Sequence, residues 1–254
     1  MKYQELSPSQ SLQHIISNYW LFEIPENSSE QRLVHHEILP ENTVSLVFID
    51  IPHYQGIRIL GPQLRKFQQD IMPPSRYLGI RFQPWISVKP LFPDKSSVIN
   101  QIQDTDASIA PAFSSFFPSA FENGFPEIHL VEHALQNYLK TCQIAKSDLV
   151  KFICLELQKG KTISEITEEI PLSIRPIQKR FKATTGLTMK QFANVVRMQK
   201  IWREMILDKK EFLSVILGNG YYDQSHFINA FQKMMKSSHR DFHAYHSSID
   251  IELF

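Results

Sequence analysis

The sequence predicts an α+β protein, in which a mainly β N-terminal domain precedes an all-α domain with two helix-turn-helix units. Three observations predict this fold. Residues 1–125 contain short apolar runs bounded by turn-forming residues, a pattern typical of strands. The second half of the chain repeats a helical motif after fifty residues. Finally, residues 171–210 hold ten basic and two acidic residues, a net charge of +8 in a chain whose net charge is +1.

The domain boundaries follow from where these patterns change. We expect a β-rich domain over residues 1–125, a linker helix over 126–146, a double helix-turn-helix domain over 147–246 and a short, frayed tail over 247–254. The linker helix carries an apolar stripe that either pairs with a second subunit or packs on the chain's own first domain. We favour pairing, so this helix is a candidate dimerisation element.

Two apolar runs of the N-terminal part, residues 43–50 and 76–82, are predicted strands. Because side chains alternate along a strand, Tyr77 and Arg81 share a face that can line a pocket. Arg81 either meets an anionic effector there or pairs with a carboxylate such as Asp50, and we favour the pairing. The aromatic residues of this half are expected in the core, namely Trp20, Phe22, Phe48, Phe82 and Trp85.

The stretch Ser173–Phe181 is predicted to be a helix with one apolar side and one side for an anion. Ser173 is a helix-capping residue, and Pro176 falls in the first turn, where its missing N–H costs little. One face carries Arg175, Gln178, Lys179 and Lys182, which recur at helical spacing. Arg and Gln are also the side chains that fit guanine and adenine edges in the major groove.

This motif occurs twice. Phe181 and Phe192 are eleven residues apart, as are Phe231 and Phe242, and the capping residues Ser173 and Asp223 stand eight residues before the first member of each pair. Two copies of one helix-turn-helix unit explain the spacing. Between them, Thr188 to Leu207 reads as one helix of about 30 Å, close to the roughly 34 Å between successive major-groove faces on one side of B-DNA.

The C-terminal hundred residues resemble the DNA-binding domain of AraC/XylS-type transcription regulators. The segment GYYDQSHFINAF, residues 220–231, matches the second unit of that family closely, and PLSIRPIQKRFKATTGLTMKQF, residues 171–192, matches the first less strictly. The resemblance implies contacts to DNA by Arg175, Gln178 and Lys179, and by Gln224, Ser225, His226 and Asn229. Separately, we expect Lys182, on the same helix face, to contact only phosphate. The resemblance also implies a core position for Phe181, Leu187, Phe192, Phe227, Phe231 and Phe242.

Several residues depart from the family pattern. Lys236 replaces a Gly that would suit a left-handed helix end, and Asn229 replaces a more usual basic residue. The other departures from the family's usual residues are Thr167, Pro171, Met189, Ile216 and His239.

Landmarks in residues 6–110, among them LPEN at Leu39 to Asn42 and GIRFQPW at Gly79 to Trp85, resemble a degenerate cupin-like barrel domain. The resemblance implies a sensor or dimerisation module. The alternative is a small-molecule- or metal-binding cupin protein with a helical interaction module, and its candidate ligands are His14, His35, His36, Glu37 and His53. On a strand His35 and His36 point to opposite faces, so they cannot share an ion. We expect no metal site and no cofactor.

The sequence therefore predicts a transcription regulator that binds DNA through two adjacent major-groove segments, with an effector bound by the N-terminal domain as a candidate means of control. The implied partners are double-stranded DNA, a small-molecule effector, a second copy of the chain and, for an activator, RNA polymerase. No nucleophile–base pair, phosphate loop or carboxylate pair supports an enzyme. Cys142 and Cys154 are expected as free thiols. Without a leader or a long apolar run, we expect a cytoplasmic protein with no membrane partner.

Overall fold

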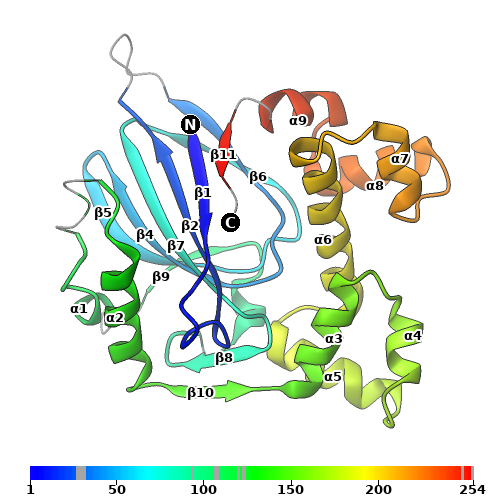
Figure 1. The fold of residues 1–254 in the computed structure, drawn as a ribbon, viewed down its shortest axis with the longest axis horizontal. Coiled ribbons are helices and arrows are strands. Elements are labelled where there is room, and N and C mark those ends of the chain that lie inside the picture. Colours follow the sequence, from blue (N-terminus) through cyan, green and yellow to red (C-terminus); the bar gives the residue numbers. More distant parts are fainter. Residues whose placement is uncertain are drawn as a thin grey trace.

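The computed structural model describes residues 1–26, 33–92, 94–105, 109–118, 121, 124–246 and 249–252. A β-rich N-terminal half and a helical C-terminal half lie side by side, with one long helix standing between the sheet and the outer helices (Figure 1). The predicted division into a mainly β part and a helical part is confirmed.

The N-terminal half is built on a seven-stranded sheet. In sheet order its strands are β11 (Asp250–Glu252), β1 (Lys2–Leu6), β2 (Ile16–Ile24), β7 (Ser75–Phe82), β4 (Ser45–Ile51), β5 (Tyr54–Leu60) and β9 (Ile102–Asp104). Two antiparallel ribbons flank it, β3 (Val34–Ile38) with β6 (Phe67–Ile71), and β8 (Ile86–Lys89) with β10 (Gln143–Lys146). The predicted strand runs correspond to β4 and β7, which pair with each other at the centre of the sheet.

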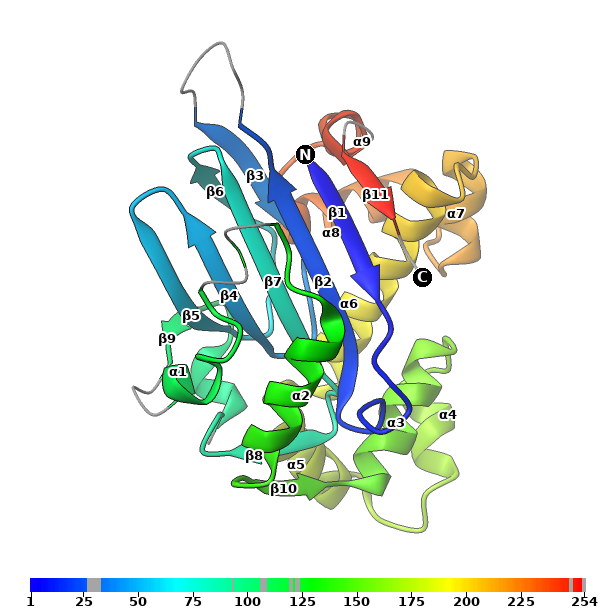
Figure 2. The ribbon, with the colours of Figure 1, turned by 60° about the vertical axis from the view of Figure 1, so that its left-hand side comes forward.

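Alternation along β7 separates two environments. Leu78, Ile80 and Phe82 are fully buried in a core that also contains the phenylalanines of the connecting region. On this side lie η1 (Lys95–Val98), α1 (Ile109–Ala112) and α2 (Ile128–Leu139), and Figure 2 shows α2 crossing in front of the sheet. The opposite face of β7 is turned to the helical half.

The apolar stripe of α2 packs on the chain's own first domain. Val131, Ala134 and Leu135 are buried in the same core as the sheet, and the Tyr19 hydroxyl donates a hydrogen bond of 3.1 Å to Glu132. After α2 the chain returns along β8 as β10. Of the two alternatives for this stripe, the structure shows the intramolecular one, so the stripe does not offer the pairing surface that we favoured.

The helical half contains two helix pairs at the positions predicted for the helix-turn-helix units. Its helices are α3 (Asp148–Gln158), α4 (Ile163–Glu168), α5 (Ile174–Thr185), α6 (Met189–Trp202), α7 (Phe212–Gly218), α8 (Gln224–Met235) and α9 (His239–His246). We call α4 and α5 the first unit, and α7 and α8 the second unit. The same cap follows each unit, because Thr188 and Ser238 each accept a hydrogen bond of 3.2 Å from the backbone N–H three residues on.

The predicted long helix is present. It begins after Thr188 as α6 and continues without a break through the π-helical segment η3 (Arg203–Leu207). At about 1.5 Å per residue it spans about 28 Å. The π-helical turn was not predicted, and the sequence contains no Gly or Pro there that would have signalled it.

The expectation of a frayed tail is wrong for the part that the structure describes. Asp250–Glu252 form β11, which pairs in parallel with β1 and so extends the N-terminal sheet. A strand of three residues has no sequence signal of its own, because the neighbouring strand that it joins lies almost 250 residues away along the chain. The C-terminal segment is therefore attached to the first domain.

Candidate nucleic-acid interface and interdomain cavity

The residues predicted to contact DNA lie on the outer faces of α5 and α8. All eight are exposed, namely Arg175, Gln178, Lys179, Lys182, Gln224, Ser225, His226 and Asn229. The apolar sides of the same helices are buried, with Ile177 and Phe181 below α5 and Phe227 and Phe231 below α8. Leu187 and Phe192 are buried as well, whereas the side chain of Phe242 lies outside the described residues.

Helix α5 presents cations that have no acidic partner in the described part of the chain. Among the described residues, Arg175, Lys179 and Lys182 form no ion pair. Ser173 occupies the N-cap position as predicted, but its side chain makes no capping hydrogen bond. The helix ends at Gly186, whose φ of 80° is the left-handed conformation that glycine adopts without strain.

Helix α8 is capped differently. The Asp223 carboxylate accepts a hydrogen bond of 2.7 Å from the backbone N–H of His226. The helix ends at Lys236, which adopts the left-handed conformation with a φ of 52°. The second unit therefore has the better N-cap and the more strained C-cap.

Both units contact the N-terminal half, and they do so through different groups. A Cβ atom added to Gly186 would lie 2.9 Å from the backbone carbonyl carbon of Lys95, so the end of α5 and η1 touch at their backbones. The Lys95 side chain is buried beneath this contact, where its ammonium donates a hydrogen bond of 3.0 Å to the Pro84 carbonyl. Burial lowers the pKa of Lys95 to about 7.

A buried polar cluster holds the second unit. Its members are Glu37 on β3, Lys66 before β6, Ser237 after α8 and His246 at the end of α9. The Lys66 ammonium donates to the Glu37 carboxylate and, at 3.1 Å, to the Ser237 hydroxyl. The His246 Nε2 atom lies 3.5 Å from the other Glu37 oxygen. A backbone hydrogen bond of 2.9 Å from Lys66 to Met234 completes the attachment.

The charge states of this cluster follow from its surroundings. Burial alone would raise the pKa of Glu37, but hydrogen bonds from His246 and Lys66 outweigh it and lower the pKa to about 2. Burial lowers the pKa of His246 and, together with the charge of His246, lowers the pKa of His36 to about 4. At neutral pH both imidazoles are therefore neutral, and Glu37 is an anion paired with Lys66.

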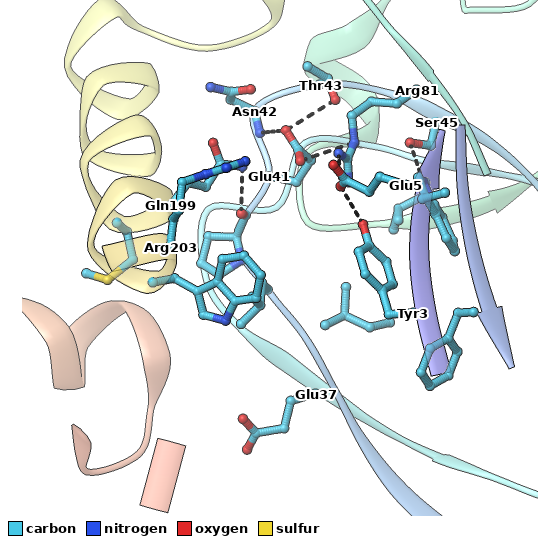
Figure 3. A pocket seen from close by; sticks show the side chains of 18 of the residues that line it. Tyr3, Glu5, Glu37, Glu41, Asn42, Thr43, Ser45, Arg81, Gln199 and Arg203 are labelled. Atoms are coloured by element: carbon cyan, nitrogen blue, oxygen red, sulfur yellow. Dashed lines mark hydrogen bonds and ion pairs between the residues drawn. The ribbon is translucent and has the colours of Figure 1, made fainter. Parts of the chain in front are cut away.

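A cavity of about 620 Å³ lies between the two halves. Strands β1, β2, β3 and β7 form one wall, α6 and η3 form another, and the segment around β11 closes part of the third. Figure 3 shows Tyr3, Glu5 and Arg81 on the sheet side and Gln199 and Arg203 on the helix side. The volume is in the range of small-molecule sites.

The polar part of the sheet wall is a network around Arg81. Its guanidinium lies 3.0 Å from a Glu5 oxygen and 3.3 Å from a Glu41 oxygen, and Figure 3 shows both carboxylates directed at it. Tyr3 donates a hydrogen bond of 2.7 Å to Glu5. Burial disfavours the charge of Arg81, but Glu41 and Glu5 raise its pKa above the ordinary value, so Arg81 stays charged.

The apolar part of the same wall is aromatic. Tyr77 and Arg81 lie on one side of β7, and Gly79 lies between them. A Cβ atom on Gly79 would lie 1.9 Å from the Trp20 ring, so only glycine lets this indole lie flat on the strand. The other aromatic side chains of the lining are Tyr3, Phe22 and Trp202.

These positions correct two expectations. Arg81 pairs with Glu5 and Glu41, not with Asp50. The register of β4 on β7 places Asp50 opposite Arg76, to which it forms an ion pair of 2.8 Å, and places Ser45 opposite Arg81. Phe22, Phe48, Phe82 and Trp85 are buried in apolar clusters as predicted, and Phe22 also borders the cavity, whereas Trp20 is half-buried and lines it. Sequence reasoning also missed Glu5, although Glu41 stands in the LPEN turn that it singled out.

The candidate metal ligands do not meet. His35 is exposed and lies 2.6 Å from Asp70, whereas His36 points the other way and stacks on Phe22 with ring centroids 4.0 Å apart. Among the described residues no group of three or more His, Cys, Asp or Glu side chains could hold a metal ion. Cys142 and Cys154 are both free.

Two family models match the chain. Residues 166–244 match a model described as a helix-turn-helix domain, and residues 4–103 match a domain of unknown function, DUF6597. No curated protein matches. In the described part of the chain, no helix combines the length and apolar character that crossing a membrane requires.

Similar solved structures share little sequence identity with this chain. The C-terminal domain of AraT, a response regulator from Geobacillus stearothermophilus, is 20% identical, with 39% of this chain and 86% of that chain covered and a TM-score of 0.36. ToxT from Vibrio cholerae O395, bound to (E)-4-(8-methylnaphthalen-1-yl)but-3-enoic acid, is 10% identical, with 97% and 100% covered and a TM-score of 0.49. ToxT from strain SCE256 with a bound unsaturated fatty acid is 10% identical, with 87% and 92% covered and a TM-score of 0.43.

Proposed function

We propose that residues 166–244, which match a helix-turn-helix domain model, form an AraC-type domain and that the protein is a transcription regulator that reads DNA with both of its units. Helices α5 and α8 would enter two successive segments of the major groove. The length of α6 and η3, about 28 Å, suits the roughly 34 Å repeat of B-DNA faces.

The observation that carries this proposal is the exposed face of α5, whose cations Arg175, Lys179 and Lys182 form no ion pair among the residues that the structure describes. Cations left without a partner on a helix whose other side is buried are suited to phosphates, because each neutralised phosphate releases counterions. Arg175 and Gln178 are suited to base edges, since each can form two hydrogen bonds at once. On α8 the exposed amides of Gln224 and Asn229 serve the same role with less charge.

We further propose that the interdomain cavity accepts a small-molecule effector. Its walls come from the sheet, from α6 and from the segment that carries His246. A ligand there would touch both the N-terminal half and the helix that joins the two units. Since coupling between two binding sites is reciprocal, such a ligand would change the affinity for DNA as much as DNA changes the affinity for the ligand.

Selection from a random duplex pool, followed by mobility-shift titrations at several salt concentrations, tests DNA binding. We expect a bound motif with two recognition segments and an affinity that falls as salt rises. Arg175→Ala should weaken binding, whereas Lys140→Ala on the exposed side of α2 serves as a control with the same loss of charge. Failure to retain any duplex at low salt would contradict the proposal and favour the alternative of a cupin-type binding protein.

A further inference from the structure

We propose that the interdomain cavity selects a ligand that carries a positive charge on an aromatic or apolar body, such as an organic ammonium compound, and disfavours carboxylates. The inference rests on the proposed function in one respect, that the cavity is a binding site. It concerns the chemical class of the ligand, and it follows from the charges and rings on the walls.

The network around Arg81 has one negative charge in excess. Glu5 and Glu41 are two carboxylates, each about four-fifths buried, and they share a single guanidinium. A ligand carboxylate at Arg81 would either meet the repulsion of these two carboxylates or displace one of them. Displacement would also break hydrogen bonds, since Glu41 accepts from the backbone N–H of Asn42 at 2.8 Å and from the Thr43 hydroxyl at 3.2 Å.

The other buried ionisable groups on the walls do not reverse this balance. Glu37 is neutralised by Lys66, and His36 and His246 are held neutral by burial. The buried wall therefore has a net charge of −1. Two cations also belong to the lining, Lys200 and Arg203, but both are exposed. Water and salt screen exposed charges far more than buried ones, so the buried excess dominates the field inside the cavity.

The rings on the walls favour the same ligand. The lining includes Tyr3, Trp20, Phe22 and Tyr77 from the sheet and Trp202 from α6. The faces of aromatic rings attract cations, and Trp is the strongest of them. Burial raises the pKa of Tyr77 to about 12 and raises that of Tyr3 further above its ordinary value, so neither phenol adds a charge at neutral pH.

Three probes with one naphthyl body and different head groups test the inference. They are 1-naphthylmethylamine, charged at pH 7, the neutral 1-naphthalenemethanol and the anionic 1-naphthoic acid. Isothermal titration of the full chain at pH 7 should give the tightest binding for the amine and the weakest for the acid. We expect a ratio of dissociation constants of at least about tenfold, which corresponds to about 1.4 kcal/mol.

Two substitutions show whether the buried excess charge causes the preference. Glu41→Gln and Glu5→Gln each bring the network to neutrality, so either should reduce the amine-to-acid ratio several-fold and leave the alcohol unchanged. Glu41→Gln could disturb the turn in which Glu41 lies, and Glu5→Gln on β1 tests the same change of charge without altering that turn. Glu127→Gln, at an exposed position of α2 away from the cavity, removes the same charge and should leave all three affinities unchanged.

The inference is overturned if naphthoate binds the wild-type chain most tightly, if no probe binds at millimolar concentration, or if the neutralised variants keep the full preference. None of these outcomes affects the proposal of DNA binding, which the mobility shift tests without a ligand. Conversely, if the chain prefers the amine but binds no duplex, the inference about the cavity stands and the proposal that the protein is a transcription regulator is contradicted.

Discussion

The two helix-turn-helix units share one sequence pattern but are attached to the N-terminal half in different ways. The first unit is continuous with the core of the sheet, because Ile177, Phe181 and Phe192 belong to the same apolar cluster as Phe82. The second unit has a core of its own around Phe227, and polar groups supply its main link to β3 and β6. The junction of the first unit contains a buried ionisable side chain, Lys95, whereas that of the second unit contains Glu37, Lys66 and His246, so the two respond to protonation in different pH ranges.

Removing one charge from the ionic junction should have the largest effect. Lys66→Ala leaves the buried carboxylate of Glu37 without its cation, which we expect to cost about 3–5 kcal/mol of unfolding free energy. Hydrogen exchange should show the loss in α8, α9 and β11 before the first unit. The double variant Glu37→Gln with Lys66→Met removes both charges and should recover much of the stability. Equal loss of amide protection in both units would contradict the conclusion that the ionic junction holds the second unit alone.

Acidification should loosen the second unit selectively. The pKa of His36 falls from 6.5 to about 4 on folding, so the unfolded chain binds more protons and about 3 kcal/mol of stability is lost between pH 6.5 and 4. The lowered pKa of Glu37, about 2 against 4.5, adds a further loss as pH falls below about 4.5. The neighbouring ionisable groups are His246, Lys66 and Tyr245.

The junction of the first unit responds in another pH range. The pKa of Lys95 falls from 10.5 to about 7 on folding, so its effect on stability changes between pH 10.5 and 7 and is constant in acid. Residue-resolved hydrogen exchange at pH 7, 5.5 and 4.5, corrected for intrinsic exchange rates, distinguishes the pH response of the first junction from that of the second. His36→Gln should flatten the pH dependence in α8 and α9 and leave α5 unchanged, and an unchanged profile in α8 and α9 would refute the assignment.

The two units should read bases at different positions of the binding site. Arg175→Ala should relax the preference at one base position by about 1–3 kcal/mol, and Gln224→Ala should do the same at a position about one helical turn away. Binding-site selection with each variant measures both. Uniform weakening over all sequences after Arg175→Ala would instead identify a phosphate contact.

The ends of the recognition helices provide a smaller contrast. Lys236→Gly should stabilise the second unit by about 1 kcal/mol, because it removes the strain of a left-handed non-glycine residue. Gly186→Ala should destabilise the first unit, since the added Cβ meets the Lys95 backbone at 2.9 Å and the φ of 80° favours glycine. Thermal unfolding of the two variants should therefore shift in opposite directions.

The smallest expected effect concerns the salt dependence of the affinity for DNA. Position 182 of the first unit corresponds to Gln232 in the second, so Lys182→Gln makes the first helix resemble the second at this point. Because Lys182 is expected to contact only phosphate, the slope of log affinity against log salt should become shallower by about one unit, with no change of base preference. A changed motif would place Lys182 at a base.

Much of the helical half was predictable from local patterns. The repeat spacing, the capping residues Ser173, Thr188 and Asp223, and the apolar periodicity predicted the units and the long helix, because helices are stabilised by residues three or four positions apart. The strands β4 and β7 were predictable for a similar reason, since alternation is also a local property.

The cavity and the two junctions depended on tertiary structure. The sequence determined that Arg81 would need a carboxylate, but only the register of β4 and β7 and the approach of β1 decided that the partners are Glu5 and Glu41. Likewise, nothing local brings Glu37, Lys66 and His246 together across more than two hundred residues. Periodicity fixes which face a side chain occupies, whereas the free energy of packing distant segments decides what that face meets.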